Sequence, residues 1–145
     1  MGVRARPGSG LARTMYDLRL WIRDTIPGAE RGLPYGERSE HVAARHLKWR
    51  GYKIIARNFR AAGAEIDVIV LDHGTLVFVE VKARMSDRLG PPELAVDDRK
   101  QARIRRAAGI FANRGGAQER EMRFDVIAII GDGRGRILEH LKDAF

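Results

Sequence analysis

The chain has 145 residues and carries 27 Lys and Arg residues against 19 Asp and Glu residues, a formal net charge of +8. This length accommodates a single domain, and such a basic domain is typical of proteins that bind a polyanion, with nucleic acid as the leading candidate. The chain has no cysteine, so disulfides, thiolate zinc sites and cysteine nucleophiles are excluded. No apolar run approaches the ~18 residues of a membrane span, and these features are compatible with a cytoplasmic protein.

Residues 1–34 are predicted to be a basic N-terminal extension ahead of a domain that spans residues 35–145. The first ten residues are rich in Gly, Arg and Pro, which is typical of disordered segments. The apolar residues that follow have the spacing of an amphipathic helix: Leu11, Met15, Leu18 and Ile22. This segment could pack on the domain, contact nucleic acid, bind a partner or reflect a start codon assigned too early, and the sequence leaves these alternatives open.

Hydrophobic periodicity and turn residues predict seven further elements. In chain order they are a helix (38–50), three strands (52–59, 66–71 and 76–81), a helix (97–113) and two strands (123–130 and 136–141). Gly51 and Gly115 stand where a helix commonly ends in glycine, and Asp97 is placed to cap the second helix. The order αβββαββ predicts an α/β domain in which helices flank a mixed β-sheet.

Two carboxylates in consecutive strands form the most informative pattern in the chain. The polar turn between these strands is Asp72-His-Gly-Thr75. If its two middle residues form the hairpin loop, Asp72 faces Thr75, and the two residue numbers of every cross-strand pair sum to 147. Asp67 and Glu80 satisfy this sum, so we expect them to face each other with Cβ atoms about 5 Å apart. Lys82 lies two residues beyond Glu80 and therefore shares its face.

Opposed like charges destabilise a sheet, and a buried carboxylate requires a counter-charge. The neighbours of Glu80 are apolar on both strand faces, with Leu76 and Phe78 beside it and Val79 and Val81 on the other face, which is typical of a buried strand. Lys82 could neutralise one charge, and a divalent cation could neutralise both. The alternative is an ordinary solvated strand face that bears an Asp, a Glu and a Lys.

This pattern resembles the PD-(D/E)XK nuclease superfamily, which has the restriction-endonuclease-like fold. More narrowly, the chain resembles the YraN family of small bacterial proteins, which is related to archaeal Holliday-junction resolvases. The matching patches are Glu40-His-Val-Ala43, Gly51-Tyr52, Arg57-Asn58, Glu65-Ile66-Asp67, Phe78-Val-Glu80-Val-Lys82-Ala-Arg84, Gly90, Lys100, Arg123-Phe124-Asp125 and Ala144-Phe145. The chain departs from the family at Ser39 and Ala64, where the family usually has glycine.

The resemblance implies a nuclease that hydrolyses phosphodiester bonds with Mg²⁺ or Mn²⁺ as cofactor. Asp67 and Glu80 would bind the metal, with the Val81 carbonyl as a third oxygen, and Lys82 would hold the attacking water or contact the scissile phosphate. The alternative for Lys82 is a salt bridge to Glu65, since their positions also sum to 147.

A helix acid often reaches the metal in this superfamily, which makes Glu40 a third candidate ligand and catalytic residue. The alternative is that Glu40 only complements the dipole of the helix, because an acid in the first turn is favoured whatever its role.

The second predicted helix carries a dense basic cluster that is expected to bind the phosphate backbone of nucleic acid. Its members on one face are Arg99, Lys100, Arg103 and Arg106. Arg84 would contact the same phosphates, and the loop over residues 85–92 would shape or gate the site. The alternative is a solvated helix face in a basic chain.

Two main hypotheses follow. The first is a metal-dependent nuclease acting on DNA in branched, damaged or single-stranded form, and the second is a non-catalytic nucleic-acid-binding module that retains the nuclease fold. A weaker third is an interaction protein that uses the N-terminal helix. Symmetric cleavage of a DNA junction would require a homodimer.

Overall fold

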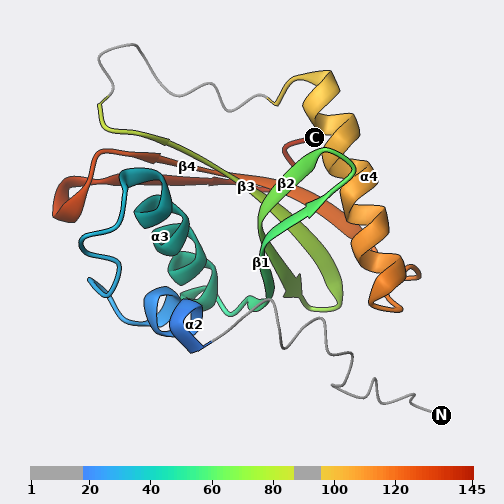
Figure 1. Cartoon of the computed structure of the whole chain (residues 1–145), viewed down its shortest axis with the longest axis horizontal. Coiled ribbons are helices and arrows are strands. Elements are labelled where there is room, and N and C mark those ends of the chain that lie inside the picture. The colour runs from blue at the N-terminus through green and yellow to red at the C-terminus, as the bar shows by residue number, and fades with distance from the viewer. Residues whose placement is uncertain (1–17, 87–95) are drawn as a thin grey trace.

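The computed structural model describes residues 18–86 and 96–145 (Figure 1). The elements are α2 (Leu18–Thr25), α3 (Tyr35–Trp49), β1 (Lys53–Ala61), β2 (Ala64–Asp72), β3 (Thr75–Arg84), α4 (Asp98–Arg114), β4 (Met122–Ile130), a 3-10 turn (Gly133–Gly135) and β5 (Ile137–Leu141). Every strand and helix predicted for the domain is present in the predicted order. The predicted helical residues Leu11 and Met15, and residues 87–92 of the predicted loop, lie outside the described residues.

The five strands form one mixed sheet in the order β1-β2-β3-β4-β5. Neighbouring strands are antiparallel except β3 and β4, which run parallel over Leu76–Arg84 and Met122–Ile130. A parallel pair needs a long crossover connection, and α4 lies in that connection. The predicted α/β domain with a mixed sheet and flanking helices is therefore confirmed.

Helices cover both faces of the sheet, with α2 and α3 on one side and α4 on the other (Figure 1). On the α3 side, Leu47 packs with valines of β2 and β3. On the α4 side, Ile104 and Ala108 pack with Phe78 and Phe124. Because both faces are covered, β3 is apolar on both faces, as its sequence predicted.

Helix α2 packs on α3 through buried charged side chains. Asp24 is fully buried and lies 2.7 Å from the Nδ1 atom of His41. In the segment after α2, Glu30 forms a buried ion pair with Arg45, whose Nη2 lies 2.8 Å from Oε1. Of the alternatives left open by the sequence, the structure therefore shows packing on the domain. No helix in the described ranges is long and apolar enough to cross a membrane.

The β2–β3 hairpin has the predicted register, with cross-strand pairs from Asp72↔Thr75 to Val68↔Val79. Both loop residues, His73 and Gly74, have positive φ angles of 46° and 96°, as a two-residue turn of type I′ requires. The ladder stops one pair before Asp67 and Glu80, so these residues do not form the regular cross-strand pair that the sequence predicted.

The two strands separate at this point because each follows a different neighbour. Strand β2 continues along β1, with pairs such as Phe59↔Ile66 and Arg60↔Glu65. Strand β3 continues along β4 as far as Arg84. In Figure 1 the β1–β2 hairpin accordingly stands across the long strands β3 and β4. Asp67 and Glu80 both line a cavity at this fork between β2 and β3.

Candidate functional site

The fork between β2 and β3 is bridged by a side chain instead of the main chain. The backbone N–H of Val81 donates a hydrogen bond of 2.7 Å to Oδ2 of Asp67. The Asp67 carboxylate thus satisfies a main-chain donor that the interrupted ladder leaves without its regular partner. This bond orients Asp67 toward β3 at the residue that follows Glu80.

A cavity of about 310 Å³ opens at the fork and brings together side chains from several elements. Glu40 of α3, Asp67 of β2 and Glu80 of β3 all line it, as do Lys100 and Arg103 of α4. The three carboxylates predicted as metal ligands therefore converge on one space, together with two residues of the predicted basic cluster.

The electrostatics of the cavity show an excess of negative charge around Asp67. Burial and the neighbouring carboxylates of Glu80 and Glu40 raise the pKa of Asp67 to about 7, although the Val81 N–H and the Lys100 ammonium act in the opposite direction. The Nζ atom of Lys100 forms an ion pair with Oε1 of Glu80, which is itself buried. A cation placed between Asp67 and Glu80 would therefore relieve repulsion that Lys100 offsets only in part.

Glu40 is held at the edge of this cavity by residues of β1. Asn58 donates a hydrogen bond of 2.9 Å from Nδ2 to Oε2 of Glu40, and a guanidinium N–H of Arg57 lies 3.5 Å from the same oxygen. Asn58 has a positive φ of 49°, a conformation that asparagine tolerates better than most residues. The patch Arg57-Asn58 was visible in the sequence, but its contact with Glu40 was not.

The structure corrects one premise about Glu40. The predicted helix began at residue 38, which placed Glu40 in its first turn, but α3 begins at Tyr35 and its first-turn acid is Glu37. Because the dipole effect is confined to the end of a helix, it does not account for an acid at position 40.

The remaining residues predicted on β3 lie beyond the cavity lining. Lys82 and Arg84 are half-buried at positions two and four after Glu80. The hydroxyl of Tyr35 donates a hydrogen bond of 2.5 Å to the carbonyl oxygen of Arg84, which ties α3 to the end of this strand. Glu65, the alternative partner of Lys82, is hydrogen-bonded by Nδ2 of Asn58 at 3.2 Å and by Nε of Arg60 at 3.0 Å.

Helix α4 begins where the sequence predicted, with Asp97 accepting a hydrogen bond of 2.9 Å from the backbone N–H of Lys100. Of its basic cluster, Arg99, Arg103 and Arg106 are exposed and Lys100 is half-buried. The sequence assigned Lys100 to phosphate binding alone and missed its contact with Glu80. That contact depends on the crossover of α4 over the sheet, which residue spacing does not specify.

The donor set of this cavity suits a hard divalent cation. Within residues 18–86 and 96–145, no three His, Asp or Glu side chains form a ready-made metal cage. Magnesium, however, keeps several waters and is commonly bound by one or two carboxylates. Asp67 and Glu80, whose charges converge at the fork, therefore fit such an ion without a complete protein cage.

A second buried carboxylate, Asp125 of β4, lies in a different environment. It accepts hydrogen bonds from Nε of Arg123 at 2.9 Å and from the backbone N–H of Asp143 at 3.0 Å, and it lies 2.8 Å from Nε2 of His140. Burial raises its pKa, but these partners outweigh burial and hold the pKa at about 2. This network fixes β5 and the C-terminal residues on β4.

Comparison with known proteins places most of the chain in one family. A model of the uncharacterised protein family UPF0102 matches residues 39–129. UPF0102 proteins of Geobacter metallireducens and Pelobacter propionicus are each 43% identical to it over 76% of this chain, and the matches cover 90% and 81% of those proteins. The UPF0102 protein of Solibacter usitatus is 42% identical over 77% of this chain and 85% of its own length. The region matched by the family model includes all three carboxylates of the cavity and excludes α2.

Proposed function

The chain belongs to the uncharacterised protein family UPF0102, which is the YraN family that its motifs resemble, and we propose that it is a metal-dependent nuclease that hydrolyses phosphodiester bonds in DNA. The observation that carries this proposal is the convergence of Glu40, Asp67 and Glu80 on one cavity at the strand fork. Carboxylates in such numbers around one space require a counter-charge, and a divalent cation that also binds a phosphate oxygen would supply it.

Each residue has a distinct role in this proposal. Asp67 and Glu80 bind Mg²⁺ or Mn²⁺, with the Val81 carbonyl as a further oxygen, and Glu40 contacts the ion directly or through water. A bound ion of this kind supplies a lowered pKa for the attacking water and offsets charge on the phosphoryl oxygens. Lys82 orients that water or contacts the scissile phosphate.

Lys100 links the carboxylates to the substrate. Its ammonium pairs with Glu80 in the structure, and a divalent cation held by Glu80 would supply this counter-charge instead. Lys100 would then be available to contact phosphate, together with Arg103, which lines the same cavity. Arg99, Arg106 and Arg84 extend this basic surface along the nucleic-acid backbone, giving salt-dependent affinity with little base preference.

The second candidate function is nucleic-acid binding without catalysis. The observation that favours it is the Lys100–Glu80 ion pair, because a lysine can neutralise one of the carboxylates permanently. This hypothesis accounts for Lys100 and the basic helix, but it assigns no role to the repulsion that raises the pKa of Asp67.

Cleavage of a panel of labelled DNA and RNA substrates separates the two functions. The panel contains duplex, single-stranded, nicked and four-way-junction forms, each incubated with Mg²⁺, Mn²⁺ or EDTA. We expect metal-dependent cleavage of at least one DNA form and none in EDTA. Binding without cleavage of any substrate under every metal condition would contradict the nuclease and support the binding module.

A further inference from the structure

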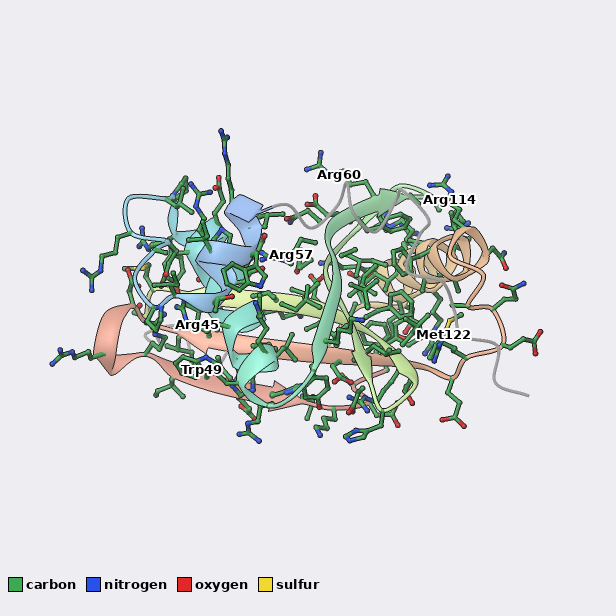
Figure 2. All side chains as sticks on the ribbon, turned by 90° about the horizontal axis from the view of Figure 1, so that it is seen from below. Arg45, Trp49, Arg57, Arg60, Arg114 and Met122 are labelled. Atoms are coloured by element: carbon green, nitrogen blue, oxygen red, sulfur yellow. The ribbon has the colours of Figure 1, made fainter. Side chains whose placement is uncertain are left out.

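Helix α2 lies outside the region matched by the family model, yet it supplies a fully buried acid, Asp24. Its Oδ1 atom lies 2.7 Å from His41 of α3 and 2.5 Å from Nη1 of Arg57 on β1. Figure 2 shows Arg57 in the interior between the helices α2 and α3 and strand β1, whereas Arg60 lies at the outer edge. Asp24 therefore joins the N-terminal segment to the strand that borders the candidate site.

The guanidinium of Arg57 is shared among three partners, and two of them belong to the candidate site. Its Nη1 donates to Asp24, its Nη2 lies 3.5 Å from Oε2 of Glu40, and its Nε donates to the carbonyl oxygen of Asp67 at 3.2 Å. The guanidinium group of arginine is planar and rigid, so it fixes the directions of these donors relative to one another. Displacing Arg57 would therefore disturb both the carboxylate of Glu40 and the backbone of β2 at Asp67.

The lengths of these contacts show how the charge of Arg57 is distributed. The contact with Asp24 is a close ion pair between two buried side chains, whereas the contact with Glu40, at 3.5 Å, is at the limit of hydrogen bonding. Glu40 takes its shorter bond from the neutral amide of Asn58. Asp24 is consequently the main counter-ion of Arg57, and the charge of Glu40 remains available to the cavity.

The buried pair between Asp24 and Arg57 is not optimised for stability. The second carboxylate oxygen of Asp24, Oδ2, is buried and has no hydrogen-bond partner among the residues that the structure describes. Such an oxygen costs free energy, and buried ion pairs often contribute less to stability than apolar residues of similar size. A role in orientation explains the arrangement better than a role in stability does.

We propose that Asp24 is a positioning residue of the candidate metal site: it holds the charge of Arg57 so that Glu40 stays free to bind a divalent cation. The inference rests on the proposed function, because it assigns Glu40 to the metal. Without the charge of Asp24, Arg57 has Glu40 as its nearest carboxylate partner, so the two form a tight ion pair and Glu40 is withdrawn from the cavity.

The first measurement is the affinity of the full chain for Mn²⁺, determined by calorimetry on wild type, Asp24→Asn and Glu30→Gln. Removing a residue that orients a metal ligand typically weakens metal affinity 10–100-fold, so we expect about a tenfold weaker affinity in Asp24→Asn. Glu30→Gln is the matched control, since it breaks the buried pair with Arg45 in the same N-terminal segment without contacting Arg57. It should lose stability and keep the wild-type affinity for Mn²⁺.

A double-mutant cycle with Glu40→Gln distinguishes positioning from a general structural effect. If Asp24 acts through Arg57 on Glu40, Asp24→Asn has no further effect on Mn²⁺ affinity once Glu40 is replaced. Wild-type affinity in Asp24→Asn, or an equal loss in both backgrounds, would overturn the proposal.

Urea unfolding of the same variants in EDTA tests the link without metal. We expect Asp24→Asn to destabilise the protein more in the Glu40→Gln background than in wild type, because Arg57 then lacks both of its carboxylate partners. Additive effects would contradict the link among the three residues. A wild-type chain that binds no Mn²⁺ would instead contradict the proposed function and with it the metal role of Asp24, so the two failures are distinguishable.

Discussion

Two aspartates in one sheet, the half-buried Asp67 of β2 and the fully buried Asp125 of β4, show how the partners of an acid separate a candidate site from a scaffold. Asp125 is surrounded by donors, and its pKa is held at about 2. Asp67 accepts a bond from one backbone N–H and faces two other carboxylates, and its pKa is raised to about 7. An acid whose surroundings oppose its own charge is typical of functional sites, whereas a fully paired acid is typical of structural networks.

The largest expected effects are on the rate of hydrolysis. They differ between Glu80 and Lys82, which lie on one face of β3. Glu80→Gln should abolish both metal binding and cleavage, because it removes a ligand charge. Lys82→Ala should leave the metal bound and reduce the rate of cleavage by ~10²–10⁴, the usual range for acid–base or electrostatic assistance. Single-turnover kinetics with calorimetry of Mn²⁺ checks both, and equally weakened metal binding in the two variants would contradict this division of roles.

The next prediction contrasts the two aspartates through stability. Asp125→Asn should destabilise the fold by about 3 kcal/mol, because it removes the charge that compensates buried donors. Asp67→Asn should raise stability in EDTA at pH 8, since it removes a carboxylate that is repelled by its neighbours. Urea unfolding at pH 8 measures both changes, and destabilisation of equal size in the two variants would remove the distinction between site and scaffold.

The pH dependence of this difference has a definite sign. The pKa of Asp67 is raised from 3.8 to about 7, so between these values the folded protein holds a proton that the unfolded chain has released. The contribution of Asp67 to the free energy of unfolding therefore falls as the pH rises from about 4 to about 7, and it stays constant above that range. The advantage of Asp67→Asn over wild type in EDTA should grow from about pH 4 to about pH 7, and a difference independent of pH would contradict the raised pKa.

Local features of the fold could be predicted from the sequence, whereas the long-range contacts that form the candidate site could not. The register of the β2–β3 hairpin followed from the turn residues, and the cap at Asp97 followed from residue type, because both are set by neighbours in the chain. The fork was not predictable, since it results from the pairing of β2 with β1 and of β3 with β4. The contacts of Lys100 with Glu80 and of Asp24 with Arg57 join elements far apart in the sequence, and they depend on how the helices cross the sheet.

The smallest expected effect concerns the exposed basic surface of α4. Replacing Arg99, Lys100, Arg103 and Arg106 with alanine should weaken DNA binding and flatten its dependence on salt, by about 0.9 in the logarithmic slope for each duplex phosphate that the variant no longer neutralises. Fluorescence anisotropy over a range of salt concentrations measures this slope. A wild-type slope in the quadruple variant would place the DNA-binding surface elsewhere.

Thermal unfolding with and without Mn²⁺ tests whether Asp67 and Glu80 form the proposed metal site. A ligand that binds the folded state raises the melting temperature, so wild type should gain stability with Mn²⁺ and Asp67→Asn should lose most of that gain. Asp72→Asn is the control, since this acid lies on the same strand but pairs with Arg123 at 2.9 Å, and it should keep the wild-type gain. The same Mn²⁺-induced rise in melting temperature in all three proteins would contradict a metal site at Asp67 and Glu80.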